Sequence, residues 1–299
     1  MLQTVRVRGD ERAIKNPVNI RQLLADLMST ALPRSEARML LSHVLKREQA
    51  WLVAHDDHEL STDELTRISA LAARRAKGEP VAYLLGEREF YGRTFRCTPA
   101  ALIPRPETEL LVDLVVACLS SGSPGNSRNN PPRVLDVGTG TGCIAITIAL
   151  EHPHALVTAL DVSADALALA RENAARLGAT NVQFLESSWF AAVADDASFD
   201  LIVSNPPYIV PGDVHLSQGD LRFEPAIALA DTIDGLESYR QIASGATRHL
   251  RPHGVLIVEH GFDQGESVPA LLREAGFSAV TTHRDLAGHP RVTTCRRGG

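Results

Sequence analysis

The stretch Val134-Leu-Asp-Val-Gly-Thr-Gly-Thr-Gly142 places strand-forming residues directly before three alternating glycines. The apolar run from Ile144 to Leu150 that follows predicts a buried helix. Gly138, Gly140 and Gly142 allow the backbone to come close to a ligand, and a helix N-terminus favours nucleotide-like molecules. A strand, a glycine loop and a helix in this order therefore predict a nucleotide-type binding site in an α/β fold.

The spacing of the glycines narrows the choice of ligand. The dinucleotide fingerprint G-x-G-x-x-G requires glycine at position 143, where this sequence has Cys143. Asp161 ends the next predicted strand and offers its carboxylate to both hydroxyls of a ribose. Together these features favour S-adenosylmethionine over NAD. Trp189, after the third predicted strand, either stacks on the adenine or is an ordinary half-buried tryptophan.

Strands and helices alternate from Arg133 onward, which predicts a mostly parallel sheet covered by helices on both faces. The expected fold class is therefore α/β, with a Rossmann-like sheet. We expect strands near 133–137, 155–160, 181–185, 199–204, 253–259, 277–283 and 291–295, and helices near 142–150, 164–177, 235–250 and 264–275.

The motif Asn205-Pro-Pro-Tyr208 follows the predicted strand at 199–204. Two prolines prevent the strand from continuing, so the chain leaves the sheet at the carboxyl end of the strand, where ligands bind in open α/β sheets. The carbonyl groups of Asn205 and Pro206 are rigid acceptors, and Tyr208 adds an aromatic ring. Such a cluster suits a planar group that carries NH₂. The alternative interpretation is a simple loop after a strand.

The N-terminal part has helical spacing from residue 20 to residue 77. Apolar stripes run through 20–27 and 37–45, and Ser61-Thr-Asp-Glu64 predicts a capping box that opens a third helix. This small all-α domain is either a structural module or a docking surface for a partner protein. The predicted organisation is a flexible tail at 1–18, a helical substrate-docking domain at 19–80, a β-hairpin linker at 81–104 and a catalytic domain at 105–299.

Two segments join the helical part to the predicted sheet. The helices end at Gly78-Glu-Pro80, and strand-forming residues from Tyr83 to Cys97 predict a hairpin. In Leu102-Ile-Pro-Arg-Pro-Glu-Thr-Glu109, two prolines hold Arg105 in an extended segment before a helix. This arm is either a well-capped helix start or part of a substrate entrance. The loop at 120–132 is a surface connection.

Composition excludes several classes of protein. The chain has 299 residues, 22% charged residues and a net charge of −6, which does not indicate a large phosphate-binding surface. Its four cysteines form no Cys-x-x-Cys pair, so we expect reduced thiols in a cytoplasmic protein, with no disulfide frame and no metal site. The N-terminus lacks an apolar signal core, and no run reaches membrane-spanning length, so we expect no membrane association.

Together, these motifs resemble the protein-(glutamine-N5) methyltransferases of the HemK/PrmC type, which modify peptide-chain release factors. Asn205-Pro-Pro-Tyr208 alone is shared with adenine amino-methyltransferases, whereas the arm at 102–109 after a helical domain is more specific to the glutamine enzymes. Ser188 and His260 depart from the family pattern, and we interpret His260 as peripheral. The resemblance covers nearly the whole chain, through residues 80–92, 102–109, 136–142, 205–208, 223–225, 234–236 and 285–288.

The resemblance implies a class I S-adenosylmethionine-dependent methyltransferase that methylates the N5 amide nitrogen of glutamine in the Gly-Gly-Gln motif of class I release factors, in support of translation termination. It implies S-adenosyl-L-methionine as cofactor, release factors as protein partners and no direct contact with nucleic acid. By the resemblance, the residues that contact the methyl donor are Asp136, Gly138, Thr139, Gly140, Thr141, Gly142, Asp161, Trp189 and Asn205. The substrate residues are Asn205, Pro206, Pro207, Tyr208 and Arg105, of which Asn205, Pro206 and Tyr208 are catalytic.

Two other functions stay open at this point. An adenine-N6 methyltransferase of DNA or RNA would use the same four residues on a flipped base. The negative net charge, the few aromatic residues and the lack of a long insertion disfavour it. The second is a cofactor-binding scaffold that works through its helical domain, which the intact Asn205-Pro-Pro-Tyr208 motif disfavours.

Overall fold

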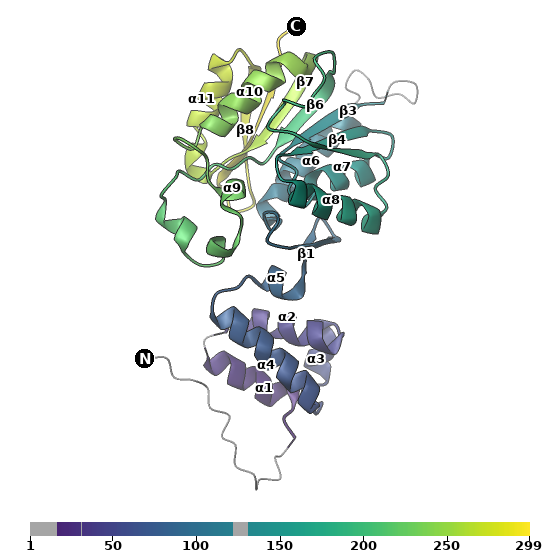
Figure 1. Ribbon diagram of the computed structural model, residues 1–299, viewed down its shortest axis with the longest axis vertical. Coiled ribbons are helices and arrows are strands. Elements are labelled where there is room, and N and C mark those ends of the chain that lie inside the picture. The colour runs from purple at the N-terminus through teal and green to yellow at the C-terminus, as the bar shows by residue number, and fades with distance from the viewer. Residues whose placement is uncertain (1–16, 31, 122–130) are drawn as a thin grey trace. The chain divides into compact units, whose positions relative to one another are not determined.

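The computed structural model describes residues 17–30, 32–121 and 131–299 (Figure 1). The chain divides into two compact units, a helical unit (Met1–Leu85) and a sheet unit (Gly86–Gly299). Most of the tail predicted at 1–18 and of the loop predicted at 120–132 lies outside the described residues. Within the described ranges, no helix combines the length and the apolar character needed to cross a membrane.

Amphipathic spacing builds the helical unit. The apolar stripes at 20–27 and 37–45 supply most of its buried core. The capping box is present, because Ser61 Oγ accepts from the backbone N–H of Glu64 (3.3 Å) and the Glu64 carboxylate accepts from the N–H of Ser61 (2.8 Å). The described helices are α1 (Ile20–Ser29), α2 (Arg34–Leu45), α3 (Gln49–Ala54), α4 (Thr62–Ala76) and α5 (Val81–Leu85).

The strand prediction that began at Tyr83 is wrong for its first residues. The N–H groups of Tyr83 and Leu84 donate to the carbonyl of Pro80 at 3.0 and 3.1 Å, which closes a turn of α5. Packing favours a helix in this segment, because Leu84 is buried in the core of the helical unit. The hairpin follows in the sheet unit, as the antiparallel pair β1 (Glu87–Phe90) and β2 (Arg93–Arg96).

A seven-stranded sheet organises the sheet unit, in the order β5-β4-β3-β6-β7-β9-β8. The five strands from β5 to β7 pair in parallel, and β9 runs antiparallel to both of its neighbours. The expected mostly parallel sheet is thus confirmed. The strands are β3 (Arg133–Val137), β4 (Leu156–Asp161), β5 (Val182–Glu186), β6 (Phe199–Ser204), β7 (Leu250–Glu259), β8 (Ser278–Arg284) and β9 (Pro290–Arg296).

Helices cover both faces of this sheet, as the sequence predicts (Figure 1). Side chains alternate along each strand, so Val134 and Val203 pack under α6 and α7 while Leu135 and Leu256 pack under α10 and α11. The helices are α6 (Glu109–Ser120), α7 (Cys143–Glu151), α8 (Ala164–Leu177), α9 (Ala226–Leu229), α10 (Glu237–His249) and α11 (Ser267–Glu274), with short 3₁₀ turns η1 (Pro106–Thr108), η2 (Val214–Ser217), η3 (Leu221–Phe223) and η4 (Phe262–Gln264).

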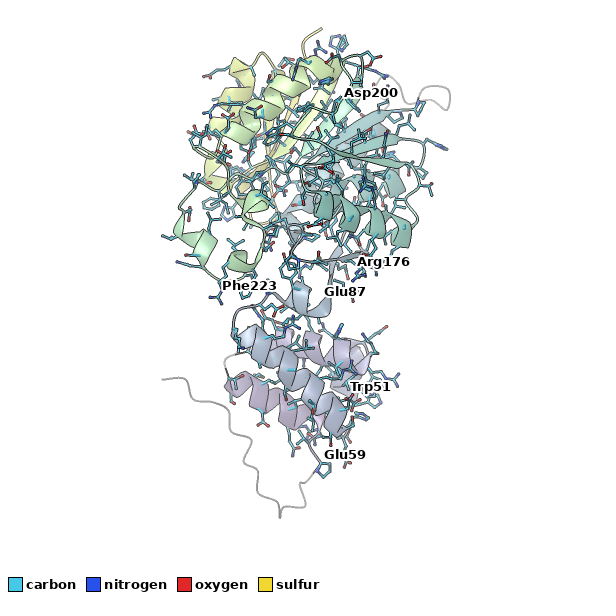
Figure 2. The ribbon with its side chains drawn as sticks, viewed as in Figure 1. Trp51, Glu59, Glu87, Arg176, Asp200 and Phe223 are labelled. Atoms are coloured by element: carbon cyan, nitrogen blue, oxygen red, sulfur yellow. The ribbon has the colours of Figure 1, made fainter. Side chains whose placement is uncertain are left out.

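The strand register brings four strand ends to one edge of the sheet. Val137 of β3 pairs with Leu160 of β4 and with Ser204 of β6, and Ser204 pairs with Val258 of β7. The glycine loop, Asp161, Asn205 and Glu259 therefore leave the sheet side by side. Figure 2 shows Asp200, near the start of β6, at the opposite end of the sheet unit from Phe223, which follows the carboxyl end of that strand.

Candidate active site

A cavity of about 370 Å³ opens at the carboxyl edge of β3, β4, β5 and β6, within the sheet unit. Its wall combines the loops after these strands with the arm at 100–105 and the segment at 227–241. Most of the predicted site residues share this one space, whereas Asp136, Gly142 and Tyr208 are not part of its wall. The predicted residues that line the cavity are Arg105, Gly138, Thr139, Gly140, Thr141, Asp161, Trp189, Asn205, Pro206 and Pro207.

The glycine loop turns tightly around the end of β4. The N–H groups of Gly138 and Thr139 both donate to the carbonyl of Leu160, at 2.9 and 2.8 Å. Gly142 has a φ of +81°, and a Cβ there would lie 2.7 Å from Cδ1 of Ile146. The left-handed backbone conformation therefore favours glycine at this position, and the N-terminus of α7 lies beside the cavity.

Asp161 presents a carboxylate to the cavity in a fixed orientation. One oxygen accepts from the N–H of Gly140 (2.8 Å) and the other from the N–H of Ser163 (2.9 Å). Each carboxylate oxygen keeps a further lone pair, so Asp161 retains acceptors for two vicinal hydroxyl groups.

Asp136 lies beneath the glycine loop and is fully buried. Burial raises its pKa to about 7, although the hydroxyl of Thr139, which donates to Oδ2 at 2.7 Å, opposes this shift. Asp136 thus holds the loop from below through Thr139, and the structure places it behind the cavity wall rather than in it.

Trp189 reaches the cavity from the segment after β5. Its backbone is in the left-handed region (φ +51°), which is uncommon for a bulky residue, and its carbonyl accepts from the Ser187 hydroxyl at 2.8 Å. The N–H of Ser187 donates to the carbonyl of Asp161 at 2.9 Å, which ties this segment to the end of β4. Ser188, one of the departures from the family pattern, is exposed and lines the same wall.

Asn205 carries a buried acceptor at the cavity wall. Its Nδ2 group donates to Oγ1 of Thr108 at 3.2 Å, while its Oδ1 atom is buried and has no hydrogen-bond partner. The preceding Ser204 donates to the carbonyl of Val137 at 2.7 Å, which anchors the motif to β3. Because buried polar atoms are nearly always paired, the Oδ1 atom is placed to receive a donor from a ligand.

Tyr208 is half-buried and packs against the core under α10 and α11. Burial raises the pKa of its hydroxyl to about 12, with a further contribution from nearby Glu259. Its carbonyl accepts from Nε2 of Gln264 at 3.4 Å. The structure therefore places Tyr208 beside the cavity, as a neutral, packed side chain.

The arm before α6 is held by an acid that the sequence reasoning missed. The carboxylate of Glu224, whose side chain is fully buried, accepts from the N–H of Ile103 (2.9 Å) and forms an ion pair with Arg105. The segments 102–109 and 223–225, both part of the family resemblance, are thus joined by this contact. In the sequence, the only signal for this contact was the glutamate within Phe223-Glu-Pro225.

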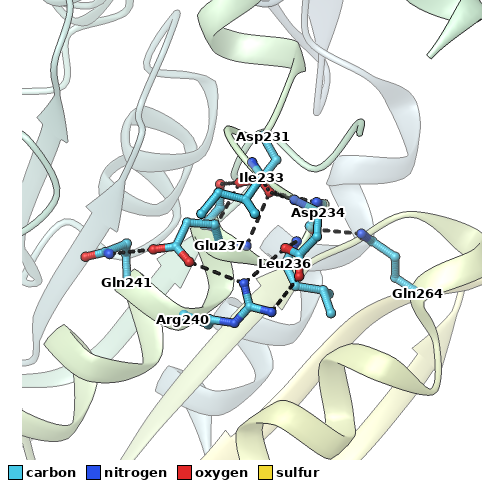
Figure 3. Close-up of polar contacts among 10 residues, drawn as sticks. Asp231, Ile233, Asp234, Leu236, Glu237, Arg240, Gln241 and Gln264 are labelled. Carbon is cyan, nitrogen blue, oxygen red and sulfur yellow. Dashed lines mark hydrogen bonds and ion pairs between the residues drawn. The ribbon is translucent and has the colours of Figure 1, made fainter. Parts of the chain in front are cut away.

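Asp231 lines the cavity and organises the turn that leads into α10 (Figure 3). Its carboxylate accepts backbone N–H groups from the turn that leads into α10, including Gly235 at 2.7 Å and Ser238 at 3.1 Å. Burial alone would raise the pKa of Asp231, but hydrogen bonds from the backbone of Thr232, Ile233 and Glu237 and from the Ser238 hydroxyl outweigh burial and lower the pKa. Arg240 braces the same turn through an ion pair with Asp234 at 2.6 Å.

The end of β7 places two buried polar residues behind this site. Glu259 is 2% exposed, and burial raises its pKa to about 7. His260 is fully buried, with Nδ1 against the carbonyl of Gly261 (2.9 Å) and Nε2 against Oγ1 of Thr293 (3.0 Å). His260 is therefore satisfied within the fold and lies outside the cavity wall, in agreement with its interpretation as peripheral.

Comparisons with known proteins agree with this architecture. A family model described as a methyltransferase domain matches residues 129–283, and one described as the PrmC N-terminal domain matches residues 19–86. Among solved structures, the T. thermophilus 16S rRNA N2 G1207 methyltransferase in complex with AdoMet and guanosine has a TM-score of 0.52 and 21% identity, over 71% of this chain and 49% of that chain. This likeness shows the class I methyltransferase fold alone.

Curated relatives are much more similar. The release factor glutamine methyltransferase of Bordetella pertussis (strain Tohama I) is 52% identical, over 91% of this chain and 98% of the relative. That of Neisseria gonorrhoeae is also 52% identical, over 88% of this chain and 93% of the relative. Because these matches extend through both units, the chain belongs to the release factor glutamine methyltransferase family.

Proposed function

We propose that this protein transfers a methyl group from S-adenosylmethionine to the N5 amide nitrogen of the glutamine in the Gly-Gly-Gln motif of class I release factors, and so supports translation termination. The reaction class follows from the family, whose curated members are named release factor glutamine methyltransferases. The observation that carries the acceptor class is the buried, unpartnered Oδ1 atom of Asn205 at the cavity wall. A primary amide supplies the N–H donor that this atom lacks.

The wall around the glycine loop fits S-adenosylmethionine. A Cβ added at Gly138 would meet no atom within 4 Å, so the backbone here borders open space. Asp161 retains acceptors for the two hydroxyls of a ribose, and Trp189 lines the neighbouring wall, where an adenine ring can stack. When bound, the donor supplies an electrophilic methyl group on a sulfonium centre.

Asn205 and Pro206 hold the acceptor amide. An amide nitrogen is a poor nucleophile, because its lone pair is delocalised into the carbonyl. Oδ1 of Asn205 and the carbonyl of Pro206 accept the two N–H groups, so positive charge that develops on nitrogen meets acceptors already in place. The methylated nitrogen is far more acidic and loses its proton to water or to these acceptors, so no separate general base is needed.

Tyr208 and Arg105 shape the site around this amide. With a pKa raised to about 12, the Tyr208 hydroxyl stays neutral, which suits a role in packing and orientation rather than in proton transfer. Arg105 lines the cavity while it pairs with Glu224, so it fixes the arm beside the substrate.

We also propose that the helical unit docks the release factor. It matches the PrmC N-terminal domain and has its own core, so the sheet does not depend on it for burial of apolar surface. The domain limits at 18, 80 and 104 stay predictions. We place the enzyme in the cytoplasm, because its four cysteines are all free and disulfides are typical of oxidising compartments.

The test incubates the enzyme with S-adenosylmethionine and, separately, a purified release factor or duplex DNA and RNA, and reads the products by mass spectrometry. We expect one added methyl group on the Gly-Gly-Gln glutamine. Asn205→Ala is expected to lose most turnover, roughly a hundredfold or more, while its melting temperature stays near wild type. Methylated adenine with an unmodified release factor would overturn the assignment, and near wild-type turnover of Asn205→Ala would overturn the mechanism.

A further inference from the structure

Three side chains from separate elements meet at the cavity wall, where Asn205 and Thr108 line the cavity and Glu259 lies behind them, and we name these three residues the buried triad. Nδ2 of Asn205 donates to Oγ1 of Thr108 at 3.2 Å, although 97 residues separate them in sequence. A hydrogen bond from the Thr108 hydroxyl lowers the pKa of Glu259 against the larger, raising effect of burial, and the Oε2 atom of Glu259 is buried without a partner. Thr108 and Glu259 are each only 2% exposed. Bulk water therefore does not compete for these hydrogen bonds.

The register of the sheet explains why the triad forms. Ser204 and Val258 are paired across the parallel strands β6 and β7, so the next residues, Asn205 and Glu259, leave the sheet at the same level. Thr108 ends the turn η1 and also lines the cavity wall. The triad thus connects the end of β7 to the side-chain amide of Asn205 at the cavity wall.

The donors and acceptors available in the triad decide the direction of its hydrogen bonds. An ionised carboxylate only accepts, so the single hydroxyl hydrogen of Thr108 is directed to Glu259. The lone pairs of Thr108 then face Asn205 and require a donor there, which is the NH₂ group. The Oδ1 atom consequently faces away from Thr108, and it is this atom that is buried without a partner.

We propose that Thr108 and Glu259 are positioning residues that lock the side-chain amide of Asn205 with Oδ1 toward the methyl-accepting amide. The proposal rests on the proposed function. An asparagine amide keeps its shape when it rotates by half a turn, but its donor and acceptor exchange places. In the rotated state, the NH₂ group of Asn205 would meet the N–H groups of the substrate and repel them.

The experiment compares matched substitutions in the full chain, at about pH 8, where Glu259 is ionised. Thr108→Val removes the hydroxyl at constant shape, Thr108→Ser keeps the hydroxyl, and Glu259→Gln adds a donor that allows Thr108 to reverse. Thr147→Val is the control, because Thr147 is fully buried in α7 and outside the cavity wall. Each variant is measured for kcat and KM of release factor methylation, donor affinity and melting temperature.

We expect Thr108→Val and Glu259→Gln to lower kcat by roughly tenfold to a hundredfold, with KM for the release factor within about threefold of wild type. Thr108→Ser and Thr147→Val are expected to stay within about threefold of wild type in kcat. The Thr108→Val, Glu259→Gln double variant is expected to be no slower than the slower single variant, because both changes release the same amide.

Turnover of Thr108→Val equal to that of Thr147→Val would overturn the proposal, and so would losses that multiply in the double variant. A readout independent of turnover is the nitrogen-15 resonance of the Asn205 side-chain amide, identified by its loss in Asn205→Ala. Its N–H groups are expected to exchange with solvent more than tenfold faster in Thr108→Val than in wild type. If wild type leaves the glutamine unmethylated, the proposed function fails, and unchanged exchange in Thr108→Val would separately overturn the triad.

Discussion

At the scale of single residues, the site is built over two buried carboxyl groups. Burial raises the pKa of Asp136 and of Glu259 to about 7, so both take up protons more readily in the folded protein than in the unfolded chain. A raised pKa means that the stabilising contribution is complete below about pH 4 and is lost as the pH rises to about 7. Ionisation of these two buried carboxyl groups, which is about half complete at pH 7, therefore costs the fold stability as the pH rises.

Replacement of Glu259 by glutamine is therefore expected to change how stability depends on pH. The difference in unfolding free energy between Glu259→Gln and wild type is expected to shift by up to about 3 kcal/mol in favour of the variant from pH 5 to pH 8, because only wild type loses stability over this range. Urea unfolding at both pH values measures this difference. Thr147→Val, which keeps every ionisable group, is expected to follow the pH profile of wild type. A constant offset of Glu259→Gln at both pH values would show that the carboxyl group does not titrate with the raised pKa.

At the scale of elements, the arm before α6 depends on one buried acid. Glu224 accepts from the N–H of Ile103 and pairs with Arg105, so a single carboxylate satisfies a backbone donor and a cation on a segment that lines the cavity. The guanidinium of Arg105 is partly exposed, which weakens the pair relative to a fully buried one. The N–H of Ile103 has no such access to water, since Ile103 is buried.

Glu224→Ala is expected to lower the unfolding free energy by about 2–3 kcal/mol, because it leaves the N–H of Ile103 unpaired and the charge of Arg105 uncompensated. The control is Glu172→Ala, which breaks an exposed ion pair with Arg96 in the same unit and is expected to cost less than about 1 kcal/mol. Both are measured by urea unfolding with wild type in parallel. Equal losses in the two variants would contradict a special role of Glu224 in holding the arm.

The elements also show how far sequence reasoning reaches. Strands β3 to β7 were predictable because short β-branched runs between turn residues carry a local signal. Helix α5 was not predictable, because the run at 81–85 suits either a helix or a strand, and only its packing in the helical unit favours the helix. Thr108 and Glu224 were missed as site residues because their partners, Asn205 and Ile103, lie 97 and 121 residues away in sequence. The glycine loop and Asn205 were found because each carries its signal within a few residues.

At the scale of the whole molecule, the two units each bury their own apolar residues, which implies two separable responses to ligands. Every residue that lines the cavity belongs to the sheet unit, and the helical unit buries its own apolar residues. Cofactor binding thus draws its contacts from the sheet unit, while we propose that release factor docking draws on the helical unit. Hydrogen exchange resolves these responses by segment, because each amide reports local opening.

S-adenosylmethionine at about 100 times its Kd is expected to slow exchange by up to about a hundredfold in the glycine loop at 138–142 and in the segment at 231–238, because binding stabilises the bound state by about 2.7 kcal/mol. The donor is expected to leave hydrogen exchange in α1, α2 and α4 unchanged, and Asp161→Ala is expected to abolish the donor effect.

Addition of a release factor is expected to slow hydrogen exchange in α1, α2 and α4. Protection of α2 and α4 by the donor alone would contradict separate responses. Unchanged exchange there with the release factor bound would mean that the helical unit does not dock it, because docking must bury some of its surface.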